Sequence, residues 1–320
     1  MIQPVTTELT SAVRIKKKAG ELGFDLCGIA PADPSAYRDY YLRWISGGYH
    51  GQMDYLARRI EEKLDPRVYF PPARSVICLA LNYHHQDKDA STTDSTSSSL
   101  RPGKIARYAR GTDYHIYVKN RLHRLADWIR ETFPGALTKV CVDTAPVMER
   151  ELAVRAGIGW QGKNTCVISP RIGSWIFLAE ILTDLELPFD TPEPDHCGSC
   201  TRCLEACPTG ALFAPYQMDA TRCISYLTIE HRDPIDPSFH DKLDGWIFGC
   251  DICQEVCPFN RKAPSSQDPD VRPRVPATVE LEKVLEWTPD DYRQLTRHTA
   301  MKRVKLPLFQ RNAQLLLEQS

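Results

Sequence analysis

Four cysteines in one short run restrict the fold of this chain more than any other feature of its sequence. They are separated by two, two and three residues, and a proline follows the last: Cys197, Cys200, Cys203 and Cys207. Bacterial two-cluster ferredoxins use this spacing, in which three thiolates wrap one 4Fe–4S cubane and the fourth reaches a second cubane. Structural zinc usually takes two separated pairs of ligands, so zinc fits the run badly. The sequence therefore predicts a unit whose core is inorganic.

A second run completes the set of expected cluster ligands. Cys250, Cys253 and Cys257 are again followed by proline, and Cys223 is the only cysteine between the two runs. We expect the last cysteine of each run to reach the other run's cluster. One cluster then takes Cys197, Cys200, Cys203 and Cys257, and the other takes Cys207, Cys223, Cys250 and Cys253. Two clusters form a path for electrons, and the segment before them is expected to hold the acceptor.

The other cysteines and the composition indicate a reduced, cytoplasmic setting. The chain has 12 cysteines in 320 residues, and cytosolic thiols are kept reduced, so metal binding is favoured over disulfides. Four cysteines lie singly in apolar, strand-like stretches and are expected to be small buried hydrophobes: Cys27, Cys78, Cys141 and Cys166. We expect no signal peptide or membrane span, because no apolar run is long enough. The net charge of −1 indicates neither a nucleic-acid binder nor a membrane binder.

The pattern of helix-like and strand-like stretches divides the chain into three segments. Residues 1–185 alternate the two and predict an α/β or α+β domain, interrupted by a serine-rich, flexible surface loop at 86–100. Residues 186–262 carry the cysteine runs. Prolines predict a linker at 263–276, and the chain is helical again from Leu281, with Thr288 as an N-cap. In the first segment we expect helices at 1–23, 37–46, 115–133 and 147–156, and strands at 25–30, 75–82, 138–142, 165–169 and 174–182.

Several residues outside the runs could carry chemistry, and each has a plain structural alternative. Asp143 follows an apolar strand, where active-site acids often lie, but the residues alone favour a helix cap. His115 and His240 are expected to be structural. The polar, aromatic stretch 107–115 could line a ligand pocket or form a solvated loop, and both alternatives stay open.

Two further sequence patterns could indicate a binding site. The glycines of 157–162 fit a dinucleotide-binding fingerprint, but they follow a helix rather than a strand, so we reject nicotinamide binding. Between 293 and 311 no acid accompanies the basic residues, and such a strip could neutralise RNA phosphates or form an ordinary solvated helix face. The strip comprises Arg293, Arg297, Lys302, Arg303, Lys305 and Arg311.

Nearly the whole chain resembles the epoxyqueuosine reductases, cobalamin-dependent iron–sulfur enzymes of queuosine biosynthesis. The resemblance rests on DPRVYFPPARSVICLALNYH, GKIARYARGTDYH, VDTAPVMERELAVRAGIGWQGKNTCVISPRIGSWIFLAEI, the cysteine set and RCISYLTIEHR. It implies an α+β fold in three parts: an N-terminal nitroreductase-like α/β cobalamin domain (1–185), a ferredoxin-type two-cluster domain (186–262), and a linker with a short, basic, helical C-terminal segment (263–320). Longer family members carry an additional C-terminal helical-repeat extension, and we expect no RNA contact of that kind from this sequence.

The resemblance also implies a reaction and the residues for it. Epoxyqueuosine in a tRNA anticodon loop would be reduced to queuosine, with electrons passing from an external low-potential donor through the clusters to the cobalt of cobalamin. Asp143 matches the family's proton donor, which overturns the helix-cap interpretation. Further positions match cobalamin contacts: Arg67, Ala109, Asp143, Ser169, Leu178, Ser225 and Arg232. His231 and the C-terminal basic residues are candidates for tRNA contact, and a monomer is expected.

Three other functions remain as alternatives. Reductive dehalogenases share cobalamin and two clusters, but they usually lack the VDTAP and GWQGKNT motifs and are expected to carry an export signal. A ferredoxin-like electron-transfer protein would bind iron without a corrinoid. A zinc-stabilised RNA-binding protein would contain neither, so metal and corrinoid content separates these classes.

Overall fold

The computed structural model describes residues 10–86 and 101–318, and a four-stranded antiparallel sheet lies at the centre of its larger part. The strands run in the order β1 (Leu26–Pro31), β2 (Ser75–Asn82), β7 (Ile176–Thr183) and β4 (Thr138–Cys141). These four elements confirm strands predicted from the sequence. Most of the predicted surface loop, residues 87–100, and the first part of the predicted N-terminal helix, residues 1–9, lie outside the described residues.

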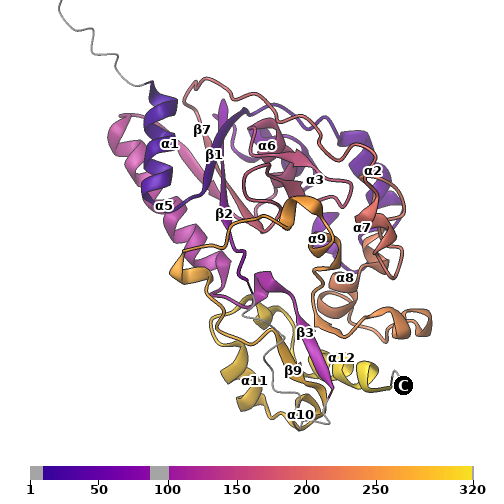
Figure 1. Cartoon of the computed structure of the whole chain (residues 1–320). Helices are drawn as coiled ribbons and strands as arrows, with labels where there is room; N and C mark the ends of the chain where they lie inside the picture. Colours follow the sequence, from indigo (N-terminus) through magenta and orange to yellow (C-terminus); the bar gives the residue numbers. More distant parts are fainter. Residues whose placement is uncertain (1–9, 87–100, 319–320) are drawn as a thin grey trace, which may run out of the picture.

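Helices cover both faces of this sheet, as Figure 1 shows. On one face α1 (Ser11–Glu21) and α5 (Tyr114–Thr132) pack on every second residue of β2, including Ile77 and Leu79. The other residues of β2, including Cys78, face α6 (Glu149–Arg155). Because both faces are covered, all eight residues of β2 are buried, and the six residues between its polar ends, Ser75 and Asn82, form a continuous apolar run.

The predicted strand at 165–169 is shorter than expected and lies outside the main sheet. Only Val167–Ile168 form a strand, β6, which pairs with β5 (Trp160–Gln161) in a two-stranded ribbon. Among the four single cysteines, Cys78 and Cys141 are buried as predicted, whereas Cys27 and Cys166 are partly exposed. The remaining α-helices of the first segment are α2 (Arg38–Ser46), α3 (Ile60–Leu64) and α4 (Pro66–Tyr69).

The cysteine-rich segment contains only short regular elements. Its α-helices are α7 (Arg202–Glu205), α8 (Ile224–Ile229) and α9 (Ile252–Glu255), and its strand is β8 (Trp246–Phe248). Short 3-10 helices occur along the described chain: η1 (Asp54–Leu56), η3 (Arg107–Ala109), η4 (Ala220–Arg222), η5 (Pro237–Lys242), η6 (Pro258–Asn260), η7 (Pro269–Val271) and η8 (Ala300–Arg303). The short elements of the cysteine-rich segment agree with the low periodicity of its sequence.

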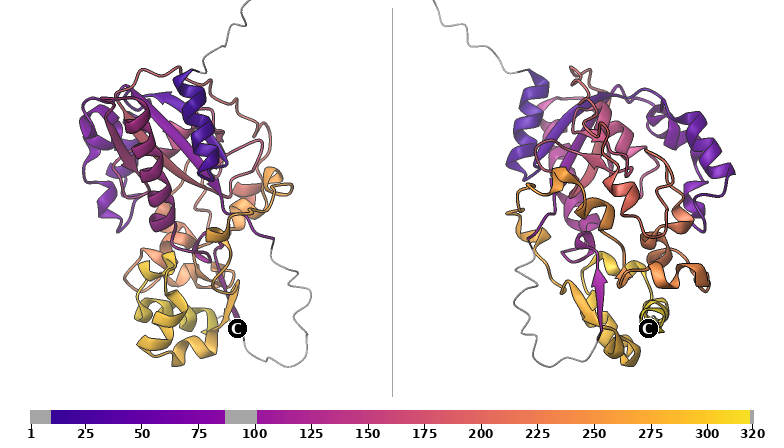
Figure 2. Two further views of the ribbon diagram at one scale, coloured as in Figure 1. Left: turned by 90° about the vertical axis from the view of Figure 1, so that its left-hand side faces the viewer. Right: turned by 45° about the vertical axis from the view of Figure 1, so that its right-hand side comes forward.

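A second sheet joins strands from all three predicted segments. Its central strand, β3 (Pro102–Ile105), pairs in parallel with β8 and antiparallel with β9 (Thr278–Glu280). A separate apolar core surrounds it, and the C-terminal helices α10 (Leu281–Glu286), α11 (Pro289–Thr296) and α12 (Leu306–Glu318) pack on that core. Figure 2 shows these helices together at one end of the molecule, beyond the main sheet. The helical C-terminal segment is thus confirmed, including the Thr288 N-cap, which forms a capping box with Asp291.

The predicted linker at 263–276 packs closely against the rest of the molecule. Apart from η7 it has no helix or strand, but Asn82 Nδ2 donates to the Pro264 carbonyl over 2.8 Å. The Arg121 side chain forms ion pairs with Asp268 and Asp270, and Val271 is buried in the core beside α5. Within residues 10–86 and 101–318, no helix combines the length and the apolar character that a membrane span requires.

Candidate active site and cluster unit

Asp143 lies just past the end of β4, in a left-handed backbone conformation. Its φ angle is 48°, in the left-handed region that few residues other than glycine adopt and that aspartate tolerates. The N-cap residue of α6 is Met148, so Asp143 does not cap that helix. Instead, the Asp143 carboxylate accepts a 2.8 Å hydrogen bond from His115 Nε2. The side chain is about half exposed (49%), so a second molecule can reach it.

His115 is held between two carboxylates at the start of α5. Asp113 caps this helix and also binds the other ring nitrogen, Nδ1, over 2.8 Å. Burial alone would lower the pKa of His115, but the hydrogen bonds and charges of Asp113 and Asp143 outweigh burial and raise the pKa to about 9. The imidazole is therefore charged at neutral pH and donates from both nitrogens. We expected a structural histidine from the sequence; the structure places it against the candidate proton donor.

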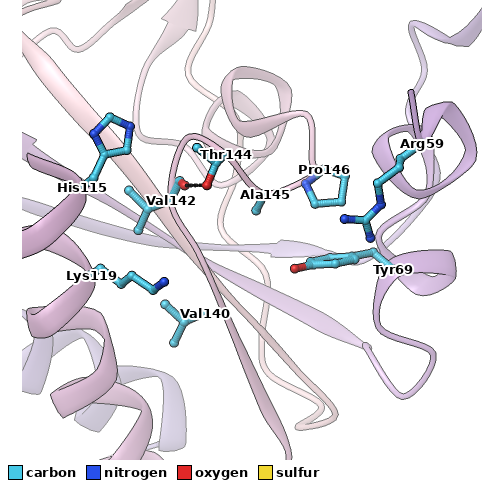
Figure 3. A pocket seen from close by; sticks show the side chains of 9 residues that line it. All are labelled: Arg59, Tyr69, His115, Lys119, Val140, Val142, Thr144, Ala145 and Pro146. Atoms are coloured by element: carbon cyan, nitrogen blue, oxygen red, sulfur yellow. Dashed lines mark hydrogen bonds between the residues drawn. The ribbon is translucent and has the colours of Figure 1, made fainter. Parts of the chain in front are cut away.

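A pocket of about 220 Å³ opens beside this pair, and Figure 3 shows how its walls are arranged. His115 and Lys119 extend from α5 on one side, Arg59 and Tyr69 lie on the other, and the 142–146 turn separates them. The Tyr69 ring lies under the cationic groups of Arg59 and Lys139, at 5.2 and 5.0 Å from the ring centroid. Of the two interpretations of 107–115, the pocket-lining one holds for His115.

Two glutamates, the partly exposed Glu149 and the buried Glu180, connect the Asp143 turn to the interior of the sheet. The backbone N–H of Asp143 donates to Glu149 Oε1, and burial together with the Asp143 charge raises the pKa of Glu149 to about 8. Glu180 on β7 lies between Cys78 and Cys141 in the sheet register and is fully buried. Its pKa is raised well above the ordinary value, by burial first and then by Glu149, and within the described chain its carboxyl oxygens have no hydrogen-bond partner. Glu180 is therefore neutral in the folded protein.

Aromatic and basic side chains from distant segments surround the exposed side of Asp143. Burial raises the pKa of Tyr108, Tyr114 and Tyr55, and the charge of Asp143 raises each further, so all three lie near it. The guanidinium of Arg303 lies 5.4 Å from the centroid of the Tyr55 ring. Arg303 also makes two hydrogen bonds with Glu230, of 2.8 and 3.0 Å. Residues from the first segment and the C-terminal segment thus meet at Asp143.

The seven cysteines of the two runs and Cys223 between them fall into two neighbourhoods. Burial raises the pKa of Cys257, and the nearby thiols of Cys197 and Cys200 raise it further. The same two thiols add to the effect of burial on Cys203. In the other neighbourhood, burial raises the pKa of Cys250, and Cys223 and Cys207 contribute as well. Cys253 lies near Cys250 and Cys223, and its thiol is hydrogen-bonded to Cys166.

These neighbourhoods have the same membership as the two predicted ligand sets. Cys197 and Cys257, which come from different runs, share a small apolar cluster with Trp160 and Phe259. Cys223 and Cys250 instead lie against the core around β8. The contact of Cys166 with Cys253 had no signal in the sequence, where Cys166 resembles any small apolar residue of a strand.

The residues expected to contact cobalamin do not share one environment. Ala109 is fully buried, and Ser169 nearly so, so their side chains have almost no surface for a ligand. Arg67 forms a surface ion pair with Asp65. Leu178 and Ser225 are half-buried, Ser225 in the same helix turn as Cys223, and Arg232 is exposed and donates to the Ile229 carbonyl.

The C-terminal basic strip is less uniform than the sequence suggests. Arg293 pairs with Asp290, and Arg303 pairs with Glu230. Arg311 donates to three backbone carbonyls, and burial lowers its pKa to about 10, so its role is structural. A pocket of about 560 Å³ is nevertheless lined by basic residues from two segments: Arg232, Arg303, Lys305 and Arg311, together with Pro307 and Leu308.

Comparison with known families matches two parts of the chain. The family described as "4Fe-4S double cluster binding domain" matches residues 196–260. The family described as "Epoxyqueuosine reductase QueG, DUF1730" matches residues 63–144, which contain Asp113, His115 and Asp143.

Full-length relatives and solved structures extend these matches. An epoxyqueuosine reductase of Cyclobacterium marinum is 41% identical over 300 residues, which cover 93% of this chain and 94% of that protein. The Escherichia coli K12 enzyme is 37% identical and matches 92% of this chain and 77% of its own. A crystal structure of epoxyqueuosine reductase with an epoxyqueuosine-modified tRNA-Tyr stem loop superposes with a TM-score of 0.88, at 33% identity, over 96% of this chain and 80% of that one.

A structure of epoxyqueuosine reductase from Bacillus subtilis superposes with a TM-score of 0.87 at 32% identity, over 96% of this chain and 80% of that one. That structure is described as having its catalytic aspartate loop swung out of the active site. With such identity along nearly its whole length, and with the double-cluster match, this chain belongs to the epoxyqueuosine reductase family.

Proposed function

We propose that this protein reduces epoxyqueuosine to queuosine in the anticodon loop of tRNA. The reaction adds two electrons and two protons to the epoxide, leaving an alkene and water. The observation that carries the proposal is the Asp143–His115 pair: a reachable carboxylate at a strand end, hydrogen-bonded to a histidine that is charged at neutral pH. Membership of the family supports the substrate, and the double-cluster match supports the supply of electrons.

Two 4Fe–4S clusters would be held by the seven cysteines of the two runs and by Cys223 between them. Cys197, Cys200, Cys203 and Cys257 would bind one cluster, and Cys207, Cys223, Cys250 and Cys253 would bind the other. The donor set fits, because eight thiols in two groups of four match the ligand count of two such clusters. The mutual neighbours of Cys257 and of Cys250 support the exchange of ligands between the runs.

Cobalamin is proposed as the second cofactor, and the positions that match the family's cobalamin contacts offer the kinds of group that it binds. A corrinoid presents an apolar macrocycle with amide and phosphate substituents, for which Leu178 offers an apolar surface and Ser225, Arg67 and Arg232 offer hydrogen-bond donors. Ala109 and Ser169 would contribute through their backbones, because their side chains are buried. When bound, cobalamin would supply the low-potential metal chemistry that epoxide reduction needs, and the clusters would supply the electrons.

The protein's own residues would then handle the protons. Asp143 would pass a proton to the departing epoxide oxygen. The charged His115 holds that proton on Nε2, within the hydrogen bond to Asp143, so the proton that the carboxylate hands on would come from the imidazolium. Asp113 keeps the ring oriented by accepting from Nδ1, and the Glu149 contact to the Asp143 N–H holds the turn.

The tRNA would approach from the side of the basic pocket near α12. Arg232, Arg303 and Lys305 line that pocket, and Arg303 also faces Asp143. Such cations neutralise phosphates, which gives affinity without sequence preference. We propose His231 as a further RNA contact, an external low-potential electron donor, a cytoplasmic location and a monomer.

The direct test uses anaerobically purified protein reconstituted with iron, sulfide and cobalamin. It is incubated with a low-potential reductant and tRNA that carries epoxyqueuosine, and the nucleosides are identified by mass spectrometry. We expect queuosine to replace epoxyqueuosine, and tRNA without the modification to remain unchanged. If the fully loaded protein leaves epoxyqueuosine intact, the proposed activity is wrong.

A further inference from the structure

The indole of Trp160 lies against one of the expected cluster ligands. Its Nε1 is 3.5 Å from the Sγ atom of Cys197 and forms a hydrogen bond with it. The side chain is almost completely buried, with 2% of its surface exposed. The rings of Phe259 and His196 contact it edge-on, at centroid distances of 4.7 and 4.8 Å. Its position is therefore fixed from two sides.

The direction of this hydrogen bond follows from the chemistry of its two partners. An indole N–H can only donate, and a cysteine that ligates iron is a thiolate and can only accept. Donation to a ligand sulfur stabilises the extra negative charge that a cluster gains on reduction, and a buried bond does so more strongly than one in water. Trp160 is thus suited to make one cluster easier to reduce.

A buried lysine from the same ribbon supports this arrangement. Lys163 follows β5, is 9% exposed, and its ammonium donates to the carbonyls of Gly198 and Cys200 over 2.6 and 3.0 Å. These carbonyls belong to the loop that joins Cys197 to Cys200, so Lys163 fixes the loop that Trp160 contacts. Its positive charge acts in the same direction as the indole donor.

The other ligand set has weaker donors. Thr209 Oγ1 lies 3.7 Å from Cys207 Sγ, and the hydroxyl must be the donor when that sulfur binds iron. Cys253 is contacted by the Cys166 thiol, which is a weak donor. The charge of Arg150 contributes to lowering the pKa of Cys166, but Arg150 donates to Thr165 rather than to a loop between the ligands of this set.

We propose that Trp160 is a positioning residue that raises the reduction potential of the cluster bound by Cys197, Cys200, Cys203 and Cys257. This inference rests on the proposed function, because it needs Cys197 to be a cluster ligand. It goes beyond that function by assigning unequal potentials to the two clusters and by naming the contact responsible. The electron added on reduction stays on the cluster, and no bond is formed or broken.

The test is the substitution Trp160→Phe, which keeps the ring packing and removes the N–H. In a redox titration of the whole protein followed by electron paramagnetic resonance, we expect the one-electron reduction of one cluster to become about fivefold less favourable. This equals about 40 mV, at 59 mV per tenfold change for one electron. The second cluster should keep its potential. An unchanged potential for both clusters overturns the inference.

Three comparisons make the result specific. Trp128→Phe removes an indole N–H on α5, outside the cysteine-rich segment, and should shift the potential of neither cluster. Thr209→Val should shift only the cluster that Trp160→Phe leaves unchanged; if both variants shift the same cluster, the assignment of Trp160 is wrong. Wild-type protein that shows no reducible cluster would overturn the proposed function and the inference together, whereas reducible but unshifted clusters overturn the inference alone.

A measurement on the wild-type protein covers the case in which Trp160→Phe does not bind iron. With indole-¹⁵N tryptophan, pulsed paramagnetic resonance of the reduced protein should detect one nitrogen coupled to a cluster. The only described tryptophan with a hydrogen bond to a cysteine sulfur is Trp160. Absence of this coupling refutes the hydrogen bond.

Discussion

The residues proposed to deliver protons and those proposed to deliver electrons are assembled in opposite ways. The proton side joins Asp143, Asp113 and His115 from a strand end and a helix start, and His115 and Asp143 are 28 positions apart in the sequence. The electron side collects its ligands within 61 residues, in loops with only short helices. One depends on a sheet whose core is apolar, and the other on the metal that its cysteines are expected to bind. Changes to one side should therefore leave the other intact.

The largest effect is expected from breaking the electron side at Cys223, the ligand between the two runs. Cys223→Ala should reduce the iron content from about eight atoms to about four and lower epoxide reduction to background. Iron analysis and the nucleoside assay measure both. The control is Cys27→Ala, a partly exposed cysteine outside the two sets, which should change neither. Full activity in Cys223→Ala would contradict its ligand role.

Breaking the proton side should slow turnover without loss of metal. Asp143→Asn keeps the size of the side chain but removes its acid, and we expect the rate of epoxide reduction to fall by about 10²–10⁴. Iron and corrinoid content should stay at wild-type values. Asp290→Asn, at an exposed surface position, is the matched control. A fully active Asp143→Asn variant would remove Asp143 from the mechanism.

The charged state of His115 predicts a pH dependence. The two carboxylates raise its pKa to about 9, so its charge, and the stability that its ion pairs add, are complete below about pH 6.5 and lost as pH rises through about 9. Activity should fall above about pH 9, and His115→Gln should be roughly tenfold slower without that fall. Tyr114 stacks on the ring and Glu149 lies near it.

Glu149 titrates near this range, with a pKa raised to about 8 by burial and by Asp143, so Glu149→Gln serves as the control for the pH profile. If Glu149→Gln removes the alkaline fall and His115→Gln keeps it, the titrating group is Glu149 and our assignment is wrong.

The smallest effect is expected where the two sides meet the RNA. Arg303→Gln should weaken tRNA binding about three- to tenfold and reduce the salt dependence by roughly one ion, as for loss of one phosphate contact. Binding is measured by filter retention at several salt concentrations. Arg293→Gln removes an arginine that pairs with Asp290 outside the pocket and should have no effect. Equal losses in both variants would argue for general charge rather than a site.

The two sides also differ in how far the sequence predicts them. Cysteine runs of this spacing are a pattern visible in the sequence itself, so the two ligand sets could be predicted without the fold, and they stay a prediction. The apolar pattern predicts β2 and α5, because burial requires it. Pattern reasoning misplaced His115, however, because only the folding of the sheet brings it to Asp143. Likewise, nothing in the sequence separates Arg311, which binds carbonyls, from Arg303 in the basic strip.

The second sheet has a consequence for how the protein is made. Its central strand, β3, leaves the ribosome well before either neighbour: β8 is synthesised some 140 residues later and β9 some 175 later. The main sheet consists only of strands from the first segment, so it can form before β8 and β9 are synthesised. During that time β3 has no partner strand. Because β9 follows all eight expected cluster ligands in the chain, this sheet can be completed only after every one of those ligands has been synthesised.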